Sequence, residues 1–341
     1  MANKKIIPVG NTTIGKQLTL IAGPCTVESE EQICEIARAV KNSGATILRG
    51  GAYKPRTNVH SFQGLHEVGI KMLLTAKQET GMPIVTEITD ISELSVMKDV
   101  DMLQVGARNM QNFELLRALG RQDKPILLKR GFAATYDELL SAAGYIRNEG
   151  NENIVLCERG IRTFEQYTRY TLDISAVPAL SQMTDLPVIV DPSHAAGRYD
   201  MIESLCYAGV AAGADGLIVE VHNNPACAVC DGRQSLKPAL FDRIAQNCIR
   251  ISGLLEGCYY NEKADTATPL KELRKNIDEI DEELSALFKK RLDCVKEIGQ
   301  YKREHNIPVT DSKRENEILA TLDEPCRKLY RKIFEISKEN E

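Results

Sequence analysis

The chain has 341 residues, of which 43 are Lys or Arg and 48 are Asp or Glu, so its formal net charge at pH 7 is -5. This acidic balance argues against general affinity for nucleic acids, and any cationic binding site must be local. There is no run of about 18 apolar residues, and the first residues lack the long apolar segment of a secretory signal, so we expect a cytoplasmic protein without membrane association. The ten cysteines show no framework spacing and are expected to be thiols or metal ligands.

The composition changes near Asn261. Residues 262–341 hold 17 Lys or Arg and 19 Asp or Glu, which makes 36 charged residues in 80 positions, and 22 of the 23 glycines precede the change. A charged segment that is poor in glycine is typical of helices. We therefore predict a first domain at 1–256, a linker at 257–269 and a helical domain at 270–341.

From Leu18 onward one pattern repeats: a short apolar run, a turn, and an amphipathic stretch such as SEEQICEIARAVKNSG. The eight apolar runs are LTLIAGPC, TILRGGA, PIVTEI, MLQVGA, ILLKRG, IVLCERG, PVIVDPSH and GLIVEVH. Eight strand and helix pairs in about 250 residues predict a closed (β/α)8 barrel, also called a TIM barrel. An open doubly wound sheet is the competing fold, but no GxGxxG follows the first strand. The predicted fold class is α/β, a (β/α)8 barrel followed by a small all-α helical domain.

The second of these runs leads into ILRGGAYKPRT, which places Arg49, Lys54 and Arg56 within eight residues, followed by Thr57. The two glycines allow the backbone to turn closely, and Pro55 restricts the backbone between two of the cations. Three cations at a strand end suit anion binding, although a basic turn that merely follows a strand is the alternative.

Each predicted strand ends near a side chain that can ionise or bind a metal. In chain order these side chains are Cys25, Arg49, Glu87, Arg108, Lys129, Arg159, His194 and Glu220. The carboxyl ends of barrel strands share one face, and that face holds the active site of such barrels, so we expect these side chains to line one site. Any one of them could be a surface charge or a capped strand end, but solvent exposure does not explain eight in register.

One subset, together with a later aspartate, provides one sulfur, one nitrogen and two oxygen ligands: Cys25, His194, Glu220 and Asp231. This mixed set suits a divalent metal ion such as Mn, Fe, Co or Zn better than Ca or Mg. Taken singly, the cysteine could be a packing residue and the histidine a hydrogen-bonded core residue. His222 lies two residues after Glu220 on the same strand face and is a rival ligand. Cys227 and Cys230 form a CxxC, but no second pair at zinc-site spacing accompanies it.

A second subset is cationic: Arg49, Lys54, Arg56, Arg108, Lys129 and Arg159. Six cations around one mouth of an acidic protein predict substrates with several negative charges, most simply two phosphorylated molecules or a phosphate plus a carboxylate. Glu87 lies among these cations and is a candidate to manage a proton or to orient water.

Seven motifs resemble, in order, 3-deoxy-D-arabino-heptulosonate 7-phosphate (DAHP) synthase, in its compact form related to 3-deoxy-D-manno-octulosonate 8-phosphate synthase. They are GPC at 23–25, LRGGAYKPRT at 48–57, GARNMQN from 106, LLKRG from 127, CERGIRTF from 157, DPSHAAGR from 191 and DGRQSL from 231. The resemblance covers roughly residues 15 to 258. The octulosonate synthase is the main rival. That enzyme typically lacks the KPRT run. The presence of this run at 54–57 here therefore points to erythrose 4-phosphate as the acceptor.

The resemblance implies an aldol-like condensation of phosphoenolpyruvate with erythrose 4-phosphate that releases phosphate. It implies that the metal ion polarises the aldehyde and is held by Cys25, His194, Glu220 and Asp231. The phosphate of phosphoenolpyruvate is then expected at Arg108 and Arg159, and its carboxylate at Lys129 and Arg49.

The same resemblance places Lys54 and Glu87 beside the reacting carbon and the attacking water. Arg56 and Thr57 are expected to hold the phosphate of erythrose 4-phosphate. Cys230 departs from the family pattern, because a small residue such as serine is expected before the aspartate, and a thiol there could make the site sensitive to oxidation.

The second domain begins with apolar residues at alternating spacings of three and four: Leu270, Leu273, Ile277, Ile280, Leu284 and Leu287, continuing at Cys294, Ile298 and Tyr301. This pattern predicts one long helix. Arg291 takes the next seam position after Leu287, where a buried guanidinium needs an anion. Lys302 lies 11 residues further at nearly the same angle, so both can point into one pocket. Arg274 lies about 26 Å before Arg291 along the axis, so it can serve that pocket only from a partner subunit.

An antiparallel dimerisation helix that tolerates one arginine would explain this pattern. The last 75 residues, however, resemble an all-helical chorismate mutase, through LRKNIDEID from 273, KKR ending at 291, VKEIGQYK ending at 302 and DSKRE from 311. The resemblance implies an intertwined homodimer, with a higher homo-oligomer left open. It also implies rearrangement of chorismate to prephenate by conformational restriction and charge stabilisation, without a nucleophile or metal.

For this second site the resemblance implies that Arg291 and Arg314, with Arg274 of the partner subunit, clamp carboxylates. Lys302 would face the ether oxygen of chorismate. Asp311 and Glu315 would face the hydroxyl group of chorismate. Ser337 matches a substrate-binding serine of the family.

Glu341 stands where many relatives carry glutamine. A carboxylate facing the ether oxygen must be protonated to donate a hydrogen bond, so mutase activity is predicted to rise as pH falls, and Glu341→Gln should remove that dependence. Because Glu341 is the last residue, fraying without any functional role is an equal alternative.

Both resemblances together predict a bifunctional shikimate-pathway enzyme in which prephenate or chorismate regulates the synthase. The alternative is an octulosonate-type synthase barrel joined to a non-catalytic helical sensor or dimerisation domain.

Overall fold

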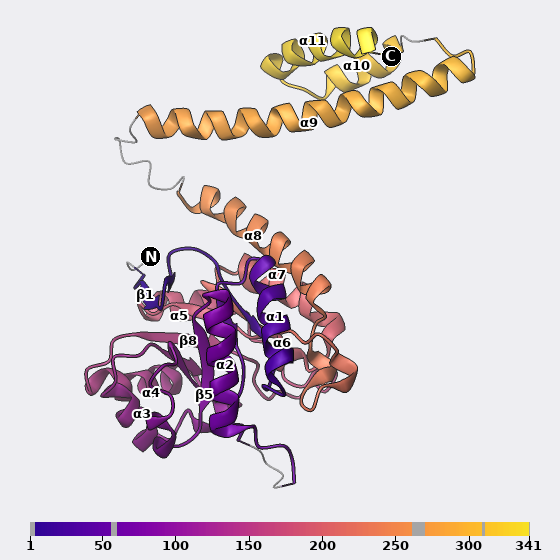
Figure 1. Ribbon diagram of the computed structural model, residues 1–341. Coiled ribbons are helices and arrows are strands. Elements are labelled where there is room, and N and C mark those ends of the chain that lie inside the picture. The colour runs from indigo at the N-terminus through magenta and orange to yellow at the C-terminus, as the bar shows by residue number, and fades with distance from the viewer. Residues whose placement is uncertain (1–3, 56–59, 261–269, 309–310, 341) are drawn as a thin grey trace. The chain divides into compact units, whose positions relative to one another are not determined.

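The computed structural model describes residues 4–55, 60–260, 270–308 and 311–340 (Figure 1). The chain divides into two compact units, Met1–Tyr260 and Asn261–Glu341. The last helix of the first unit, α8 (Pro238–Tyr260), continues into the start of the predicted linker, and the rest of that linker, 261–269, lies outside the described residues.

In the first unit, eight parallel strands close into a barrel in the order β10-β3-β4-β5-β6-β7-β8-β9. Each lies inside one of the eight predicted apolar runs, so the predicted (β/α)8 barrel is confirmed. The strands are β3 (Thr19–Gly23), β4 (Ile47–Arg49), β5 (Ile84–Ile88), β6 (Met102–Val105), β7 (Ile126–Lys129), β8 (Ile154–Glu158), β9 (Val188–Val190) and β10 (Gly216–Glu220).

Helices cover the outside of these strands (Figure 1). They are α1 (Glu30–Asn42), α2 (His66–Thr80), α3 (Phe113–Gly120), α4 (Tyr136–Asn148), α5 (Ala176–Met183), α7 (Ile202–Ala211) and α8. The short α6 (Pro192–Ala196) instead follows the carboxyl end of β9. The prediction of a full helix after every strand is wrong for one connection. Between β5 and β6 the described chain forms a 3-10 helix, η1 (Ile91–Ser95), because this short connection must also contain two turns.

A hairpin that sequence reasoning missed precedes the barrel. Strands β1 (Ile7–Val9) and β2 (Thr12–Ile14) pair antiparallel. Their three buried residues, Ile7, Val9 and Ile14, form one apolar cluster with inward-facing side chains of all eight barrel strands. The hairpin thus caps the barrel interior from the amino ends of the strands, and the carboxyl ends remain available for a site.

The second unit contains the predicted long helix, α9 (Leu270–Glu304), followed by α10 (Ser312–Ala320) and α11 (Glu324–Asn340). Helix α11 packs against α9 and α10. Within this single chain the first half of the predicted seam is open, since Ile277, Ile280, Leu284 and Leu287 are 53% to 62% exposed.

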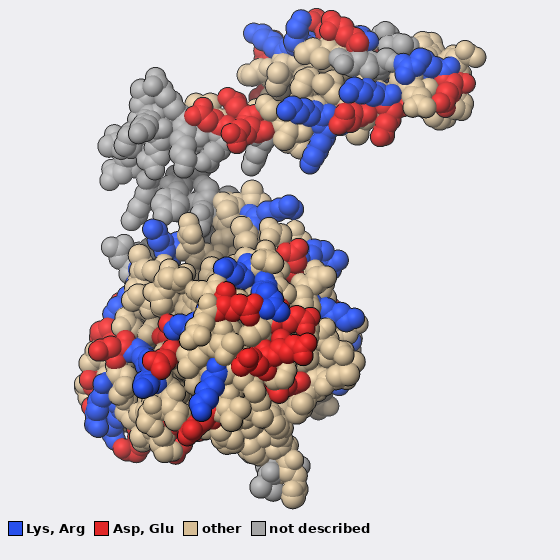
Figure 2. Space-filling view, in the orientation of Figure 1, with Lys and Arg blue, Asp and Glu red and all other residues tan. Residues whose placement is uncertain are grey.

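Acidic and basic side chains are mixed over the face shown in Figure 2, in agreement with the small net charge. Among the described residues, none of the helices has both the length and the apolar character needed to cross a membrane.

Candidate functional site

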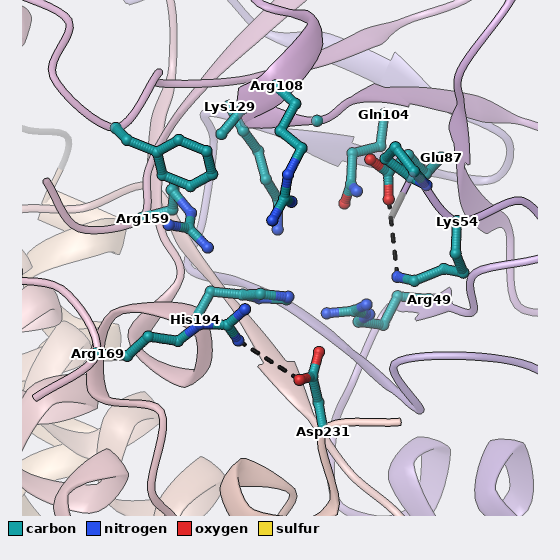
Figure 3. A pocket seen from close by; sticks show the side chains of 14 residues that line it. Arg49, Lys54, Glu87, Gln104, Arg108, Lys129, Arg159, Arg169, His194 and Asp231 are labelled. Atoms are coloured by element: carbon teal, nitrogen blue, oxygen red, sulfur yellow. Dashed lines mark hydrogen bonds and ion pairs between the residues drawn. The ribbon is translucent and has the colours of Figure 1, made fainter. Parts of the chain in front are cut away.

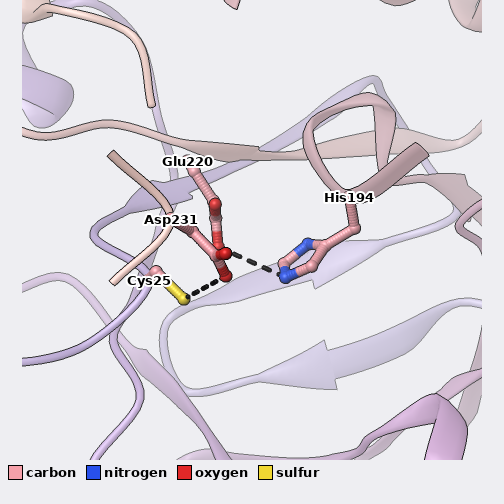
Figure 4. Close-up of side chains that lie close together, drawn as sticks. All are labelled: Cys25, His194, Glu220 and Asp231. Atoms are coloured by element: carbon pink, nitrogen blue, oxygen red, sulfur yellow. Dashed lines mark hydrogen bonds and ion pairs between the residues drawn. The ribbon is translucent and has the colours of Figure 1, made fainter. Parts of the chain in front are cut away.

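Four side chains from separate segments meet at the carboxyl end of the barrel (Figure 4). Ligand atoms of Cys25, His194, Glu220 and Asp231 all lie within 4.8 Å of one another. The Cys25 Sγ atom lies 3.1 Å from Asp231 Oδ2, and His194 Nε2 lies 3.4 Å from Glu220 Oε1. The structure therefore brings together the four ligands predicted from the sequence.

The orientation of His194 follows from the start of α6. Asp191 caps this helix by accepting a hydrogen bond from the His194 backbone N–H, at 3.0 Å. The same carboxylate lies 2.8 Å from His194 Nδ1 and also accepts from Lys129 Nζ. Because Asp191 occupies Nδ1, the Nε2 atom is the one that faces the other three ligands.

The polar surroundings of Glu220 are incomplete without a cation. Gln234 Nε2 donates to Glu220 Oε2 at 2.7 Å, but the buried Oε1 atom has no hydrogen-bond partner among the described residues. Arg49 Nη1 lies 3.2 Å from Oε1 without the alignment of a hydrogen bond. An unsatisfied buried carboxylate oxygen that faces a thiol and an imidazole fits a divalent metal ion.

The electrostatics of the four groups agree with this fit. Burial, together with Glu220, raises the pKa of the Cys25 thiol well above its usual value, so without a cation the thiol keeps its proton. Burial also raises the pKa of Asp231, but His194 and the hydrogen bond from Cys25 outweigh burial and lower it to about 2. A divalent ion held by these four residues would replace the thiol proton and balance the carboxylates.

The rival histidine takes part in a different cluster. His222 Nδ1 accepts from the Asn224 backbone N–H at 2.9 Å, and Nε2 lies 2.9 Å from Gln32 Nε2 and 3.4 Å from Glu28 Oε1. His222 is therefore engaged in holding the loop after β10 and is not one of the four clustered ligands. In the CxxC, Cys227 is exposed and Cys230 is buried.

A cationic cavity adjoins the four ligands (Figure 3). Five of the predicted cations line it: Arg49, Lys54, Arg108, Lys129 and Arg159. Glu87, His194 and Asp231 line it as well. Arg56 and Thr57 lie outside the described residues, so their predicted role stays a prediction.

Sequence reasoning missed three further residues that line the cavity: Gln104, Phe132 and Arg169. Gln104 could have been found, because it is the strand partner of Glu87 in the register of β5 and β6 and shares its orientation. Phe132 and Arg169 lie in loops after β7 and β8, where no periodic signal indicates which side chains turn inward.

Lys54 and Glu87 form a pair at the edge of this cavity. Lys54 Nζ lies 3.7 Å from Glu87 Oε2 and donates to the Cys25 carbonyl at 3.1 Å. Burial lowers the pKa of Lys54, but nearby acidic groups, Glu87 among them, outweigh burial and hold this pKa above its usual value, so the amine is charged. Gly106 leaves the space for the Glu87 carboxylate, which any side chain at that position would displace.

A second cavity, of about 270 Å³, lies within the helical unit. Its polar lining includes Arg291, Lys302, Asp311, Arg314, Glu315 and Ser337. Arg291 Nη1 donates to Ser337 Oγ, which joins α9 to α11. Lys338 Nζ pairs with Glu315 Oε1 at 2.8 Å, which joins α11 to α10.

The structure thus brings all six of these predicted residues into one cavity. The Asp311 side chain also caps α10, accepting from the Arg314 backbone N–H at 3.0 Å. The Arg274 side chain and Glu341 lie outside the described residues, and their predicted roles stay predictions.

A (β/α)8 barrel with a four-residue cluster that could hold a metal ion, beside a cationic cavity, fits the class of metal-dependent barrel enzymes whose substrates are anions. The chain belongs to the DAHP synthetase I family, which matches residues 4–254. Residues 273–341 match chorismate mutase type II, so a chorismate mutase domain follows the DAHP synthase domain.

Known relatives agree with this assignment. The chain is 49% identical over 252 residues to phospho-2-dehydro-3-deoxyheptonate aldolase of Thermotoga maritima, covering 73% of this chain and 75% of the relative. It is 32% identical over 273 residues to 2-dehydro-3-deoxyphosphooctonate aldolase of Syntrophotalea carbinolica, covering 74% and 97%. The crystal structure of the Thermotoga maritima DAHP synthase matches with a TM-score of 0.72 at 48% identity, covering 74% of this chain and 75% of that one.

Proposed function

We propose that this protein is a bifunctional shikimate-pathway enzyme. Its barrel condenses phosphoenolpyruvate with erythrose 4-phosphate to DAHP and phosphate, and its helical domain rearranges chorismate to prephenate. The observation that carries the proposal is the occurrence of both family matches in one chain, each over a segment that forms a cavity with several cationic side chains in its lining.

In the barrel, Arg108 and Arg159 bind the phosphate of phosphoenolpyruvate, because neither is paired with a described carboxylate. Lys129 and Arg49 attract its carboxylate at a site where Asp191 and Glu220 hold them in place. A divalent ion held by the four ligands, when bound, polarises the aldehyde of the acceptor.

Lys54 and Glu87 border the reacting carbons. The charged Lys54 amine can provide a proton to an oxygen that becomes negative, and the Glu87 carboxylate can orient the water that attacks the phosphoenolpyruvate carbon. Arg56 and Thr57 are proposed to hold the phosphate of erythrose 4-phosphate.

In the helical domain, the cavity holds the dianion in its compact conformer between fixed cations. Arg291 is held by Ser337 and Lys302 lies along the same helix, so their charges are in place before chorismate binds. Arg314 provides a third cation, and Asp311 with Glu315 faces the hydroxyl side.

We further propose a homodimer formed through α9. The exposed apolar residues Ile277, Ile280, Leu284 and Leu287 need a cover, and a second copy of α9 would provide one. Such a partner would also bring Arg274 of the partner subunit to the cavity. We also propose that the enzyme acts in the cytoplasm.

The test of the synthase is a substrate comparison. Phosphoenolpyruvate consumption should occur with erythrose 4-phosphate and not with arabinose 5-phosphate, which the octulosonate synthases use as acceptor. Treatment with a chelator should abolish it, and Mn, Fe, Co or Zn added singly should restore it to different extents and so identify the native metal. Turnover with arabinose 5-phosphate alone would contradict the assignment.

The test of the mutase is the loss of chorismate measured separately. Chorismate consumption should continue in the presence of the chelator, because no metal takes part. A helical domain that binds chorismate without turnover would show that it is only a sensor.

A further inference from the structure

The cations of the barrel cavity fall into two groups, according to whether a carboxylate lies within ion-pair distance of them. Six cations of the described residues line the cavity. Four have a carboxylate within 4.0 Å: Arg49 with Glu220, Lys54 with Glu87, Lys129 with Asp191 and Arg169 with Asp231. The other two, Arg108 and Arg159, form no ion pair with any described carboxylate, and both lie against an aromatic ring.

That ring belongs to Phe132. The guanidinium carbon of Arg159 lies 4.9 Å from its centroid, and that of Arg108 lies 5.2 Å from it. Arg159 also lies 4.5 Å from the centroid of Tyr170, whose ring stacks on Phe132 with centroids 5.0 Å apart and planes inclined by 13°. Two more guanidinium groups lie near these rings, Arg162 at 5.5 Å from the Phe132 centroid and Arg169 at 5.9 Å from the Tyr170 centroid. The two cavity cations without a carboxylate partner thus share one aromatic pair.

Backbone contacts hold this aromatic pair in place. Arg130 Nε donates to the Ala134 carbonyl at 2.8 Å and closes the loop that carries Phe132. The Phe132 carbonyl accepts from the Arg162 backbone N–H at 2.6 Å, and the Tyr170 backbone N–H donates to the Ala195 carbonyl at 2.8 Å. The backbone that carries both rings is therefore held, and the two rings stack on each other.

Support of an arginine by an aromatic ring, and not by a carboxylate, leaves more of its N–H groups available to a phosphate. A carboxylate would take up guanidinium N–H groups and repel a phosphate dianion. An aromatic face attracts the guanidinium through its quadrupole and accepts no in-plane N–H, so those donors stay free. The buried Nη1 atom of Arg159 has no hydrogen-bond partner among the described residues, so this donor is available to a phosphate. Arg49 Nη1 also lacks a hydrogen-bond partner there, but it lies 3.2 Å from the Glu220 carboxylate.

We propose that Phe132 is a positioning residue for phosphoenolpyruvate, whose ring, supported by Tyr170, holds Arg108 and Arg159 with their N–H groups directed to the phosphate. The inference rests on the proposed condensation, because it assigns those two arginines to that phosphate. It adds a specificity element: the ring contributes to binding of the phosphate and not of the acceptor aldehyde.

The test is Phe132→Leu in the full-length, metal-loaded enzyme. Leucine keeps an apolar side chain but removes the quadrupole, so the KM for phosphoenolpyruvate should rise about tenfold, the loss expected for two partly desolvated cation–π contacts. The KM for erythrose 4-phosphate should change less than about twofold. Phe132→Tyr retains the ring and should restore the KM for phosphoenolpyruvate to near the wild-type value.

Inorganic phosphate is the probe that separates positioning from folding. As a competitor of phosphoenolpyruvate, it should inhibit Phe132→Leu about tenfold more weakly than wild type. A carboxylate competitor without phosphate, such as pyruvate, should inhibit both equally. Tyr170→Leu should shift phosphate inhibition in the same direction and provides a second variant if Phe132→Leu does not fold.

Phe113→Leu is the matched control. Phe113 stacks on Tyr145 with centroids 4.5 Å apart, and Arg117 lies 5.3 Å from the Tyr145 centroid, but this aromatic pair joins α3 to α4 outside the cavity. This variant should leave both KM values and phosphate inhibition unchanged.

Equal phosphate inhibition of wild type and Phe132→Leu would overturn the inference, as would a rise in both KM values that Phe132→Tyr does not reverse. Wild-type enzyme without activity on phosphoenolpyruvate and erythrose 4-phosphate would instead overturn the proposed function, so the two failures are distinguishable.

Discussion

Single side chains decide the chemistry of the helical cavity, and Arg291 is the clearest case. We predict that Arg291→Ala lowers the rate of chorismate turnover at least about 100-fold, because a cation that clamps a substrate carboxylate holds chorismate in its reactive conformer, and loss of such positioning costs about this much. Chorismate loss at saturating substrate measures the effect, and size-exclusion chromatography should show an unchanged oligomer. Arg331→Ala, which removes an exposed arginine of α11 outside the cavity, is the control and should keep full activity. Full turnover by Arg291→Ala would exclude this cavity as the mutase site.

At this same scale, some site residues could be predicted and others could not. Cys25, His194 and Glu220 were predictable because a parallel barrel places strand ends on one face whatever the loops do. Asp191 and Phe132 were not assigned roles, because their contributions depend on contacts with Lys129 and with other loops, and sequence spacing does not encode such contacts.

At the scale of elements, the loops after β7 and β8 are held behind the cavity by a buried ion network. Arg130 Nη1 lies 2.9 Å from Glu158 Oε2 and 2.8 Å from Asp173 Oδ2, and Tyr136 Oη donates to Asp173 at 2.8 Å. The network joins the end of β8 to the start of α4 and to the segment before α5. It therefore holds the loop after β7, which carries Phe132, and the start of the loop after β8, which carries Arg159.

This network predicts a stability that depends on pH. Burial raises the pKa of Asp173, but hydrogen bonds from Ser175, Arg130 and Tyr136 outweigh burial and hold it below its usual value. A lowered pKa means that the carboxylate stabilises the fold above its unfolded pKa of about 3.9, and that this contribution is lost as pH falls through the lower folded pKa. Asp173→Asn should therefore cost about 1–3 kcal/mol at pH 7, with a smaller difference from wild type below about pH 4.

Urea unfolding of the barrel at pH 7 and near pH 3.5 measures both effects. Glu149→Gln is the control, because it removes the exposed pair between Arg121 Nε and Glu149 Oε2, 2.8 Å apart, and should leave the unfolding midpoint nearly unchanged. A difference between Asp173→Asn and wild type that stays constant at all pH values would show that the charge is not what stabilises the network.

The elements themselves were largely predictable, with two informative exceptions. All eight strands follow from apolar runs that end in turns, and α9 follows from its heptad-like seam. The hairpin of β1 and β2 was missed because three-residue strands carry too little pattern. The prediction of an α-helix between β5 and β6 was wrong, because sequence periodicity does not show how few residues of this connection are left once its two turns are formed.

At the scale of the whole molecule, a synthase and a mutase in one chain join an early and a late reaction of the same pathway. If a ligand of the helical cavity changes the affinity of the barrel for phosphoenolpyruvate, linkage requires phosphoenolpyruvate to change the affinity for that ligand by the same factor. Typical couplings are about 5- to 150-fold. Reciprocity provides a test that needs no knowledge of how the two units are arranged.

We predict that prephenate lowers the DAHP synthase rate of the full chain, and that Arg291→Ala abolishes this response while leaving the basal synthase rate intact, because the variant changes only the helical cavity. Initial rates with and without prephenate measure the response, and calorimetric binding of prephenate with and without phosphoenolpyruvate measures the reciprocal effect.

Lys296→Ala, which removes an exposed pair with Asp293 on the same helix, should retain the full response. Removing residues 262–341 should give a synthase that is insensitive to prephenate. If prephenate has no effect on the full chain, and this removal has none either, the fusion does not regulate the barrel.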